Sequence, residues 1–276
     1  MERILVAVDF SDASRRALRN AVELARVFGG ELRVVHVLPR LTYDKQRAAL
    51  GLTRGAGDLE SQHRLHELVA GELHADLDEL AAVSQKLLEG NVHEEILEDA
   101  KRWGASLIVV GSHDRSAFGR LFSGSVSSRI VSRSSLPVLM VHSAGGLKPE
   151  RILAAVDGGE STGAVLESAA NWASTLGANL MLIHVVQNHA ELRLKQIRKD
   201  VEAELTKCAS GKPLPQVEYR VGTADREICA FAAETGQDLV IVGAHVTRGV
   251  LDFGNTAARV AHHCPCSVLI AREGEA

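Results

Sequence analysis

The first half of this 276-residue chain has no cysteine, and the whole chain has few aromatic residues. The four cysteines of the second half are too few and too unevenly placed for the disulfide framework of a secreted domain. They are Cys208, Cys229, Cys264 and Cys266. Aromatic side chains make up 4% of the residues, and alanine, valine and leucine dominate, which is typical of layered α/β packing.

The chain also lacks a long apolar run and a basic surface pattern. No apolar run approaches the roughly 18 residues of a membrane-spanning helix. The net charge is −4, and no basic stretch alternates with aromatic residues, which argues against a nucleic-acid surface. The N-terminal residues predict a strand rather than a cleavable signal. We therefore expect a cytoplasmic protein without a membrane or nucleic-acid partner.

What the sequence does contain is an internal duplication. Arg3–Asp9 reads RILVAVD and Arg151–Asp157 reads RILAAVD, at an offset of 148 residues. Residues 104–113 match residues 236–245 at an offset of 132, so the second copy is 16 residues shorter between its second and fourth strands. A repeat of this length predicts two domains.

The stretch between the copies, residues 143–149, consists largely of small residues and turn formers. We place the boundary there and expect one domain at 1–143 and another at 150–276. Within each copy, short apolar runs that predict strands alternate with segments whose apolar residues recur at helical spacing. Alternating strands and helices predict a parallel sheet with helices on both faces. The expected strands are 3–9, 32–38, 83–89, 106–110 and 137–142, then 151–157, 179–186, 216–221, 238–243 and 267–271, and the first-copy helices are 13–28, 59–80, 93–103 and one starting at 126.

A phosphate-binding cradle is predicted at Gly111–Ser127. A buried strand precedes this stretch and a helix begins at Val126, with Gly124 and Ser125 at its start. Glycine lets backbone amides approach a ligand, and a helix start offers N–H groups and the positive end of a dipole. A plain connecting turn is the alternative.

Two further segments end at the same edge of the predicted sheet. Asp9, Val37 and Gly111 each stand at the carboxyl end of a strand, where ligands bind in open parallel sheets. Because three separate segments converge there, the sequence favours the cradle over the plain turn in the first copy.

Six motifs follow one another along the first copy: AVDFS (7–11), VHV (35–37), LLEGNVHEEI (87–96), VVGSH (109–113), GSVS (124–127) and LPVLMV (136–141). With these motifs in this order, the chain resembles the universal stress protein family in its tandem, two-domain form. The resemblance covers nearly the whole chain and implies two tandem open parallel-sheet α/β sandwiches of five strands each, Rossmann-like and similar to the adenine nucleotide alpha hydrolases. It further implies that the fifth strands of the copies meet, with the domains paired about a pseudo-two-fold axis.

The resemblance implies that the first domain binds ATP or AMP. Members that bind ATP carry glycine, two residues, glycine, nine residues, glycine and Ser/Thr; this sequence keeps the spacing but has Asp114 at the second glycine. Adenine and ribose would lie by Ala7, Val8, Asp9 and Val37, ribose and first phosphates by Val110 and Gly111, and phosphate by Gly124, Ser125, Val126 and Ser127.

Asp114 is the departure that bears on this implied site, because a carboxylate aimed at a triphosphate repels it. Asp114 either points to solvent, while Arg115 or Arg120 reaches the phosphates, or helps to hold Mg²⁺. His113 contacts phosphate or hydrogen-bonds backbone. We expect the solvated aspartate and the backbone-bonded histidine.

The second copy departs further from the pattern. It keeps Asp157 and Gly243, but Val246 replaces the middle glycine and Asn255 replaces Ser/Thr. We expect weak or absent nucleotide binding there. The cluster His262–Cys266 has only one residue between its thiols and no counterpart in the first copy, so we expect neither a metal site nor redox use.

The predicted function is that of a stress-response protein acting as a nucleotide-dependent regulatory or binding module. The alternatives are a nucleotide-free scaffold or interaction protein and a slow ATP hydrolase; no paired base and nucleophile and no P-loop are present. The extra segment Tyr43–Asp78 is a lid, a partner surface or a variable insertion. The sequence leaves homodimerisation open.

Overall fold

The computed structural model describes residues 2–39, 56–73, 83–112, 126–142, 149–159, 161–186, 199, 202–203, 206, 215–244 and 255–272. The chain divides into two compact units, and the division falls inside helix α6 (Val126–Arg133), after Ile130. Unit 1 holds the described residues up to Ile130, and unit 2 holds those from Val131 onward. The end of the first sequence copy therefore belongs to unit 2.

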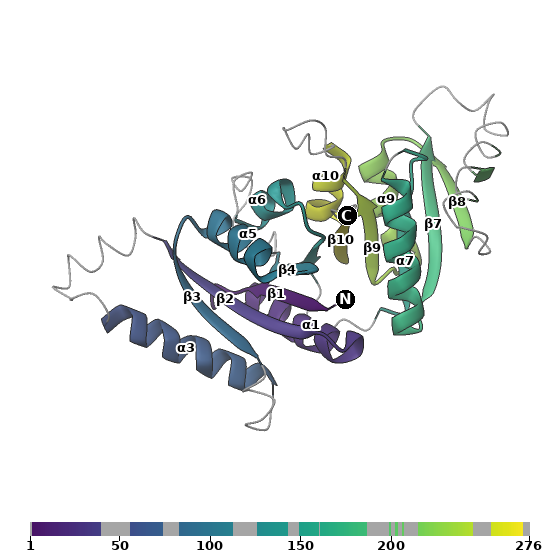
Figure 1. Cartoon of the computed structure of the whole chain (residues 1–276). Helices are drawn as coiled ribbons and strands as arrows, with labels where there is room; N and C mark the ends of the chain where they lie inside the picture. The colour runs from purple at the N-terminus through teal and green to yellow at the C-terminus, as the bar shows by residue number, and fades with distance from the viewer. Residues whose placement is uncertain are drawn as a thin grey trace. The chain divides into compact units, whose positions relative to one another are not determined.

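Unit 1 contains a four-stranded parallel sheet in the order β3-β2-β1-β4. Helices α1 and α3 lie on one face of this sheet and α5 on the other (Figure 1). This alternation confirms the α/β architecture predicted from the sequence. The elements are β1 (Arg3–Ala7), α1 (Asp12–Phe28), β2 (Glu31–Pro39), α3 (Ala56–Leu73), β3 (Ser84–Gly90), α5 (Val92–Trp103) and β4 (Leu107–Gly111).

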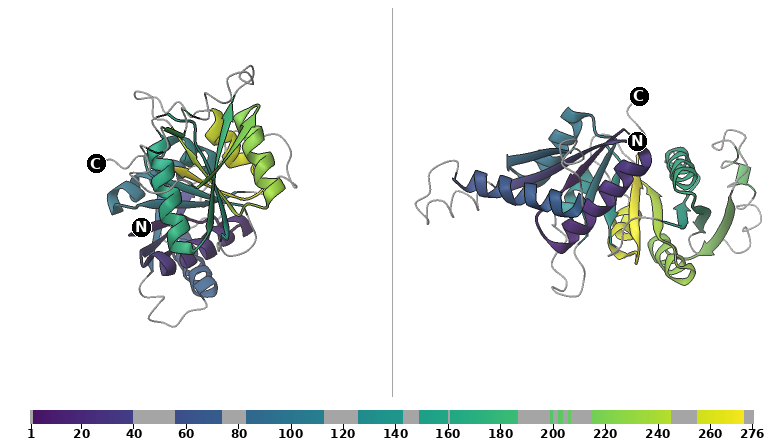
Figure 2. Two further views of the ribbon diagram at one scale, coloured as in Figure 1. Left: turned by 90° about the vertical axis from the view of Figure 1, so that its right-hand side faces the viewer. Right: turned by 90° about the horizontal axis from the view of Figure 1, so that it is seen from below.

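Unit 2 contains strands in the order β5-β10-β9-β6-β7-β8. Helix α7 lies on one face of them and α9 and α10 on the other (Figures 1 and 2). The elements are β5 (Val138–Val141), β6 (Arg151–Ala155), α7 (Thr162–Leu176), β7 (Asn179–Val186), β8 (Gln216–Val221), α9 (Ala224–Thr235), β9 (Leu239–Gly243), α10 (Asn255–His263) and β10 (Ser267–Ala271).

The strands β5 and β10 pair antiparallel, with Leu139 opposite Leu269. This bears out the expectation that the fifth strands of the two copies meet. Arg272, buried at the end of β10, donates from Nη2 to the backbone oxygen of Val131 at 2.8 Å, and burial lowers its pKa to about 10. The Nε2 atom of His142 lies 2.8 Å from the backbone oxygen of Ala261. These contacts explain why residues 131–142 join unit 2.

Local sequence signals fix the ends of the helices. Helix α1 begins after Ser11, whose side chain accepts a hydrogen bond from the Ser14 amide, and ends at Gly29 with φ of 65°. Ser11 is therefore the N-cap residue of α1. The buried stripe of α1, which includes Leu18 and Leu24, packs on the sheet because its apolar residues recur with helical period.

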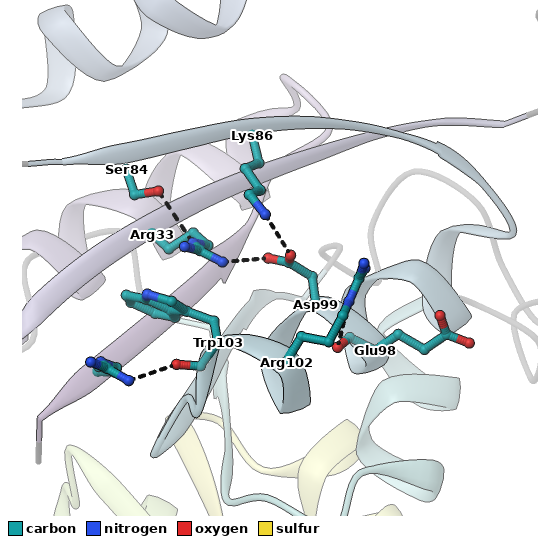
Figure 3. Close-up of polar contacts among 8 residues, drawn as sticks. Arg33, Ser84, Lys86, Glu98, Asp99, Arg102 and Trp103 are labelled. Atoms are coloured by element: carbon teal, nitrogen blue, oxygen red, sulfur yellow. Dashed lines mark hydrogen bonds and ion pairs between the residues drawn. The ribbon is translucent and has the colours of Figure 1, made fainter.

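A buried charge joins α5 to β2 and β3. The carboxylate of Asp99, whose side chain is 1% exposed, lies 3.2 Å from Arg33 Nη1 and 3.1 Å from Lys86 Nζ (Figure 3). Arg33 also donates from Nε to Ser84 Oγ at 3.2 Å and stacks over Trp103, 4.4 Å from the ring centre. The opposite charges satisfy the buried carboxylate, so this part of unit 1 is held by a polar cluster.

Candidate functional site

The turn after β1 is closed by a small hydrogen-bond network around Asp9. The Ser11 amide donates to Asp9 Oδ1 at 3.0 Å, and the Ser11 hydroxyl donates to the same oxygen. The Asp9 amide donates to Ser14 Oγ at 3.2 Å. Asp9 is exposed, so the network fixes its carboxylate at the carboxyl end of β1 without burying it.

Phe10 follows Asp9 in a left-handed conformation, with φ of 66°, which is costly for a residue other than glycine. Its ring centre lies 4.4 Å from that of His36, and the Arg64 guanidinium stands over the ring at 4.5 Å. These contacts help to hold the strained turn in place. This cluster could not be predicted from sequence, because Arg64 comes from α3 in the extra segment of the first copy.

His36 is joined to the end of β1 by a hydrogen bond. Its Nδ1 lies 2.8 Å from the Val8 oxygen, which can only accept, so Nδ1 carries the proton. Burial lowers the pKa of His36, and the Arg64 charge adds to this, while the bond to Val8 and the Asp9 carboxylate oppose it. The ring thus acts as a brace between β2 and β1.

Gly111 lies where β4 meets the first turn of α1. A Cβ atom there would clash with the backbone of Ala13 and lie 2.9 Å from the Ser14 amide nitrogen. Close approach to α1 therefore requires glycine at this position, independently of any ligand.

The start of α6 is tied to the same point. The Ser127 hydroxyl donates to the Gly111 oxygen at 2.9 Å, so the first turn of α6 lies beside the carboxyl end of β4. Val126, the first residue of the helix, is 39% exposed. The positive end of the helix dipole and an exposed side chain thus stand at the edge where the predicted site lies.

The structure brings the described part of the predicted site together. β1 pairs with both β2 and β4, and the Val8 amide donates to the Val35 oxygen at 2.9 Å, next to His36. The residues placed at this edge are Ala7, Val8, Asp9, Val37, Val110, Gly111, Val126 and Ser127. The predicted residues His113, Asp114, Arg115, Gly124 and Ser125 lie outside the described part of the chain.

The corresponding edge of the second copy is built differently. Asp157 Oδ1 accepts from the Gly159 amide at 2.8 Å and from the Thr162 hydroxyl at 3.2 Å, much as Asp9 does. Gly158, with φ of 78°, occupies the place of Phe10. At the start of α10, the buried Ala257 replaces Ser127, so the hydroxyl tie to the preceding strand is absent at that position.

Three thiols of the second copy form a separate cluster. Cys264 Sγ lies 2.9 Å from Cys229 Sγ on α9, and both Cys264 and Cys266 are buried. Sequence spacing missed Cys229, because it lies far from the His262–Cys266 stretch along the chain. In the described ranges, no group of three or more His, Cys, Asp or Glu side chains is arranged to hold a metal ion.

The model of the Universal stress protein family matches residues 1–142 and 149–272. The chain belongs to the universal stress protein family. Its two matches show the tandem form, since each covers one copy of the duplication. Within the part of the chain that the structure describes, none of the helices is both long and apolar enough to cross a bilayer.

Individual relatives agree with this assignment. The stress response protein NhaX of Bacillus subtilis is 32% identical over 162 residues, covering 51% of this chain and 97% of NhaX. Universal stress protein Mb2028c of Mycobacterium bovis is 28% identical over 184 residues, covering 61% of this chain and 62% of that protein. The chain therefore matches less than two thirds of the length of this second relative.

Solved structures support the fold over the whole chain. The crystal structure of a universal stress protein from Archaeoglobus fulgidus superposes with a TM-score of 0.71 at 21% identity, covering 99% of this chain and 98% of that one. A second, from Pseudomonas aeruginosa, also has a TM-score of 0.71, at 19% identity. At these identities the likeness concerns architecture alone.

Proposed function

We propose that the first copy binds an adenine nucleotide, ATP or AMP, at the carboxyl edge of β1, β2 and β4. The observation that carries the proposal is the hydrogen bond from Ser127 to Gly111, which sets the start of α6 beside this edge. A helix of eight residues there offers amide donors and a favourable dipole to a phosphate group.

The base and ribose would lie over the other side of the same edge. Val8 and Val37 are buried there, and the Asp9 carboxylate is fixed by Ser11. An apolar floor with one oriented carboxylate suits a purine with its ribose hydroxyls, because few polar groups then determine the orientation. The resemblance adds His113, Asp114, Arg115, Gly124 and Ser125, whose roles remain part of the proposal.

In this proposal the protein is a cytoplasmic stress-response module whose conformation or partners respond to the nucleotide. The second copy acts as a scaffold, and the domains, bounded at 143 and 150, form an intramolecular pseudo-dimer. In the second copy, Ala257 lacks the hydroxyl group that Ser127 provides in the first. Asn255 begins α10 at the position where the nucleotide-binding pattern has Ser or Thr. These differences support one nucleotide per chain.

The test uses a charge placed at each helix start. Val126→Asp puts a carboxylate at the exposed first position of α6, where it favours the helix but repels phosphate. Thr256→Asp makes the matched change in the second copy. Protein purified without added nucleotide is denatured, and the released adenylate is identified and counted.

We expect about one adenylate per chain in the native protein and in Thr256→Asp, and at least about a tenfold weaker affinity in Val126→Asp. Two nucleotides per chain would contradict the scaffold role of the second copy. Titration with and without EDTA then decides whether Mg²⁺ takes part.

A nucleotide-free interaction protein is the second candidate. Gly111 is required by its contact with α1, and the Ser127 hydroxyl already bonds to Gly111, so both have structural reasons to be present. Absence of released adenylate, together with no binding of added Mg-ATP or AMP, would establish this candidate instead.

A further inference from the structure

The thiols of Cys229 and Cys264 lie in contact although they come from different helical segments. Cys229 is on α9, and Cys264 follows the last residue of α10, which packs on α9. Their sulfur atoms are 2.9 Å apart. A disulfide has a sulfur separation of about 2.05 Å, so only a small movement of the two side chains separates this contact from a bond.

The two thiols differ in access to solvent. Cys229 is half-buried, whereas Cys264 is 4% exposed. Hydrogen bonding to Cys229, then to Cys266, together with burial, raises the pKa of the Cys264 thiol. A small oxidant therefore reaches Cys229 first, and Cys264 remains a protonated thiol directly beside it.

The first copy has no such pair. The corresponding positions are Leu97 on α5 and Ser134 after α6. The Ser134 hydroxyl donates to the Leu136 oxygen at 2.8 Å, a local turn bond that needs no partner on α5. The paired thiols are thus a property of the second copy and are independent of the proposed nucleotide site.

We propose that Cys229 and Cys264 form a reversible disulfide when the protein meets hydrogen peroxide. The Cys229 thiolate attacks a peroxide oxygen; an S–O bond forms, the O–O bond breaks, and hydroxide leaves and is protonated to water. The Cys264 sulfur then attacks the Cys229 sulfur; an S–S bond forms, the S–O bond breaks, and a second water leaves with the Cys264 proton.

The bond would connect α9 to the turn that leads into β10. Cys266 immediately precedes β10, the strand that pairs with both β9 and β5. Oxidation at this turn would therefore restrain the segment that leads into β10, the strand on which β5 pairs. The peroxide gains two electrons, one from each cysteine, and a dithiol reductant restores both thiols.

The experiment uses the full chain, reduced, freed of reductant and treated with hydrogen peroxide under native conditions. The intact mass is measured first; the remaining thiols are then alkylated, and the intact mass and a non-reducing peptide map are recorded. We expect the mass before alkylation to fall by two hydrogen atoms, a linked peptide pair containing Cys229 and Cys264, and reversal by dithiothreitol. Cys264→Ser should leave Cys229 as a sulfenic acid that dimedone labels, whereas the native chain is not labelled.

Cys266→Ser and Cys208→Ser are the matched controls and should keep the Cys229–Cys264 link. A link through Cys266 or Cys208, or four alkylatable cysteines after peroxide treatment, would overturn the proposal. If a serine variant does not fold, the peptide map of the native chain still shows which cysteines are linked and therefore decides the proposal.

Discussion

The two copies share strand order and turn architecture but stabilise the face between their second and third strands in different ways. In the first copy, Asp99 is buried between Arg33 and Lys86. In the second, Phe231 occupies the place of Asp99 and Met181 that of Arg33. One copy thus uses a buried charge cluster where the other uses apolar packing.

The second copy keeps its charges at the rim of this face. Arg220 stacks over Phe231 at 4.9 Å and pairs with Glu234 at 2.8 Å and Glu218 at 2.9 Å. The fold therefore does not require a buried carboxylate at the position of Asp99, because the second copy has Phe231 there. The charge cluster is one way to pack a helix on this sheet. The buried Asp99 carboxylate is stable only while its partners Arg33 and Lys86 are present.

Removing the buried carboxylate should have the largest effect. Asp99→Ala leaves the largely buried Arg33 without its counter-charge, so we expect a loss of about 3 kcal/mol of unfolding free energy. The measurement is urea unfolding followed by Trp103 fluorescence in a Trp172→Phe background, because these two are the only tryptophans.

The matched double variant places the residues of the second copy, Met181 and Phe231, at the corresponding positions of the first. Arg33→Met combined with Asp99→Phe should lose less stability than Asp99→Ala alone, because the apolar pair that fills these places in the second copy leaves neither Arg33 nor Asp99 as a buried charge. A smaller loss for Asp99→Ala than for the double variant would show that the charge cluster contributes little.

The glycines at the ends of β4 and β9 give the next contrast. Gly111→Ala forces a Cβ against the Ala13 backbone, which cannot rotate away, so we expect a loss of about 2 kcal/mol. Gly243→Ala meets the side chains of Ser161 and Val165 instead, and should cost less because these can adjust. Equal losses in urea unfolding would mean that both contacts relax in the same way.

The left-handed turn residues Phe10 and Gly158 provide a test with a smaller expected effect on stability. Gly158→Ala meets no atom within 4 Å, so its cost reflects backbone strain alone, about 1 kcal/mol. Phe10→Gly relieves the same strain but loses the ring contacts with His36 and Arg64, and we expect little net change. Clear stabilisation by Phe10→Gly would show that those contacts are weak.

The pH dependence of His36 should be the smallest effect. Its folded-state pKa lies below the unfolded value of about 6.5, so the stabilisation from its neutral ring is complete above that value. It is lost as the pH falls towards and through the folded-state pKa, because the unfolded chain binds the proton more readily.

His36→Gln removes this titration. We expect the stability advantage of the native chain over the variant to shrink by less than about 1 kcal/mol between roughly pH 7.5 and pH 5. His184→Gln, which removes the equivalent bond to Val156, is the control for loss of the brace itself. An advantage that grows on acidification would contradict the assigned direction.

Much of the fold was predictable because its signals are local or periodic. The duplicated strand at Arg3 and Arg151 and the glycine stop at Gly29 follow directly from sequence. The helix expected at 59–80 is observed as Ala56–Leu73, while residues 74–82 lie outside the described ranges. The convergence of Asp9, Val37 and Gly111 followed from the rule for parallel sheets, and the structure shows these strand ends on paired strands.

The duplication, the order of strands and helices, and the edge where the candidate site lies could be predicted from the sequence, because periodicity and turn chemistry act over short stretches. Three contacts could be found only in the folded chain: the packing of Gly111 against α1, the hydrogen bond from Ser127 to Gly111, and the contact of Cys229 with Cys264. Each of these contacts joins segments separated along the chain, and crossover packing fixes their distance, which no local pattern records.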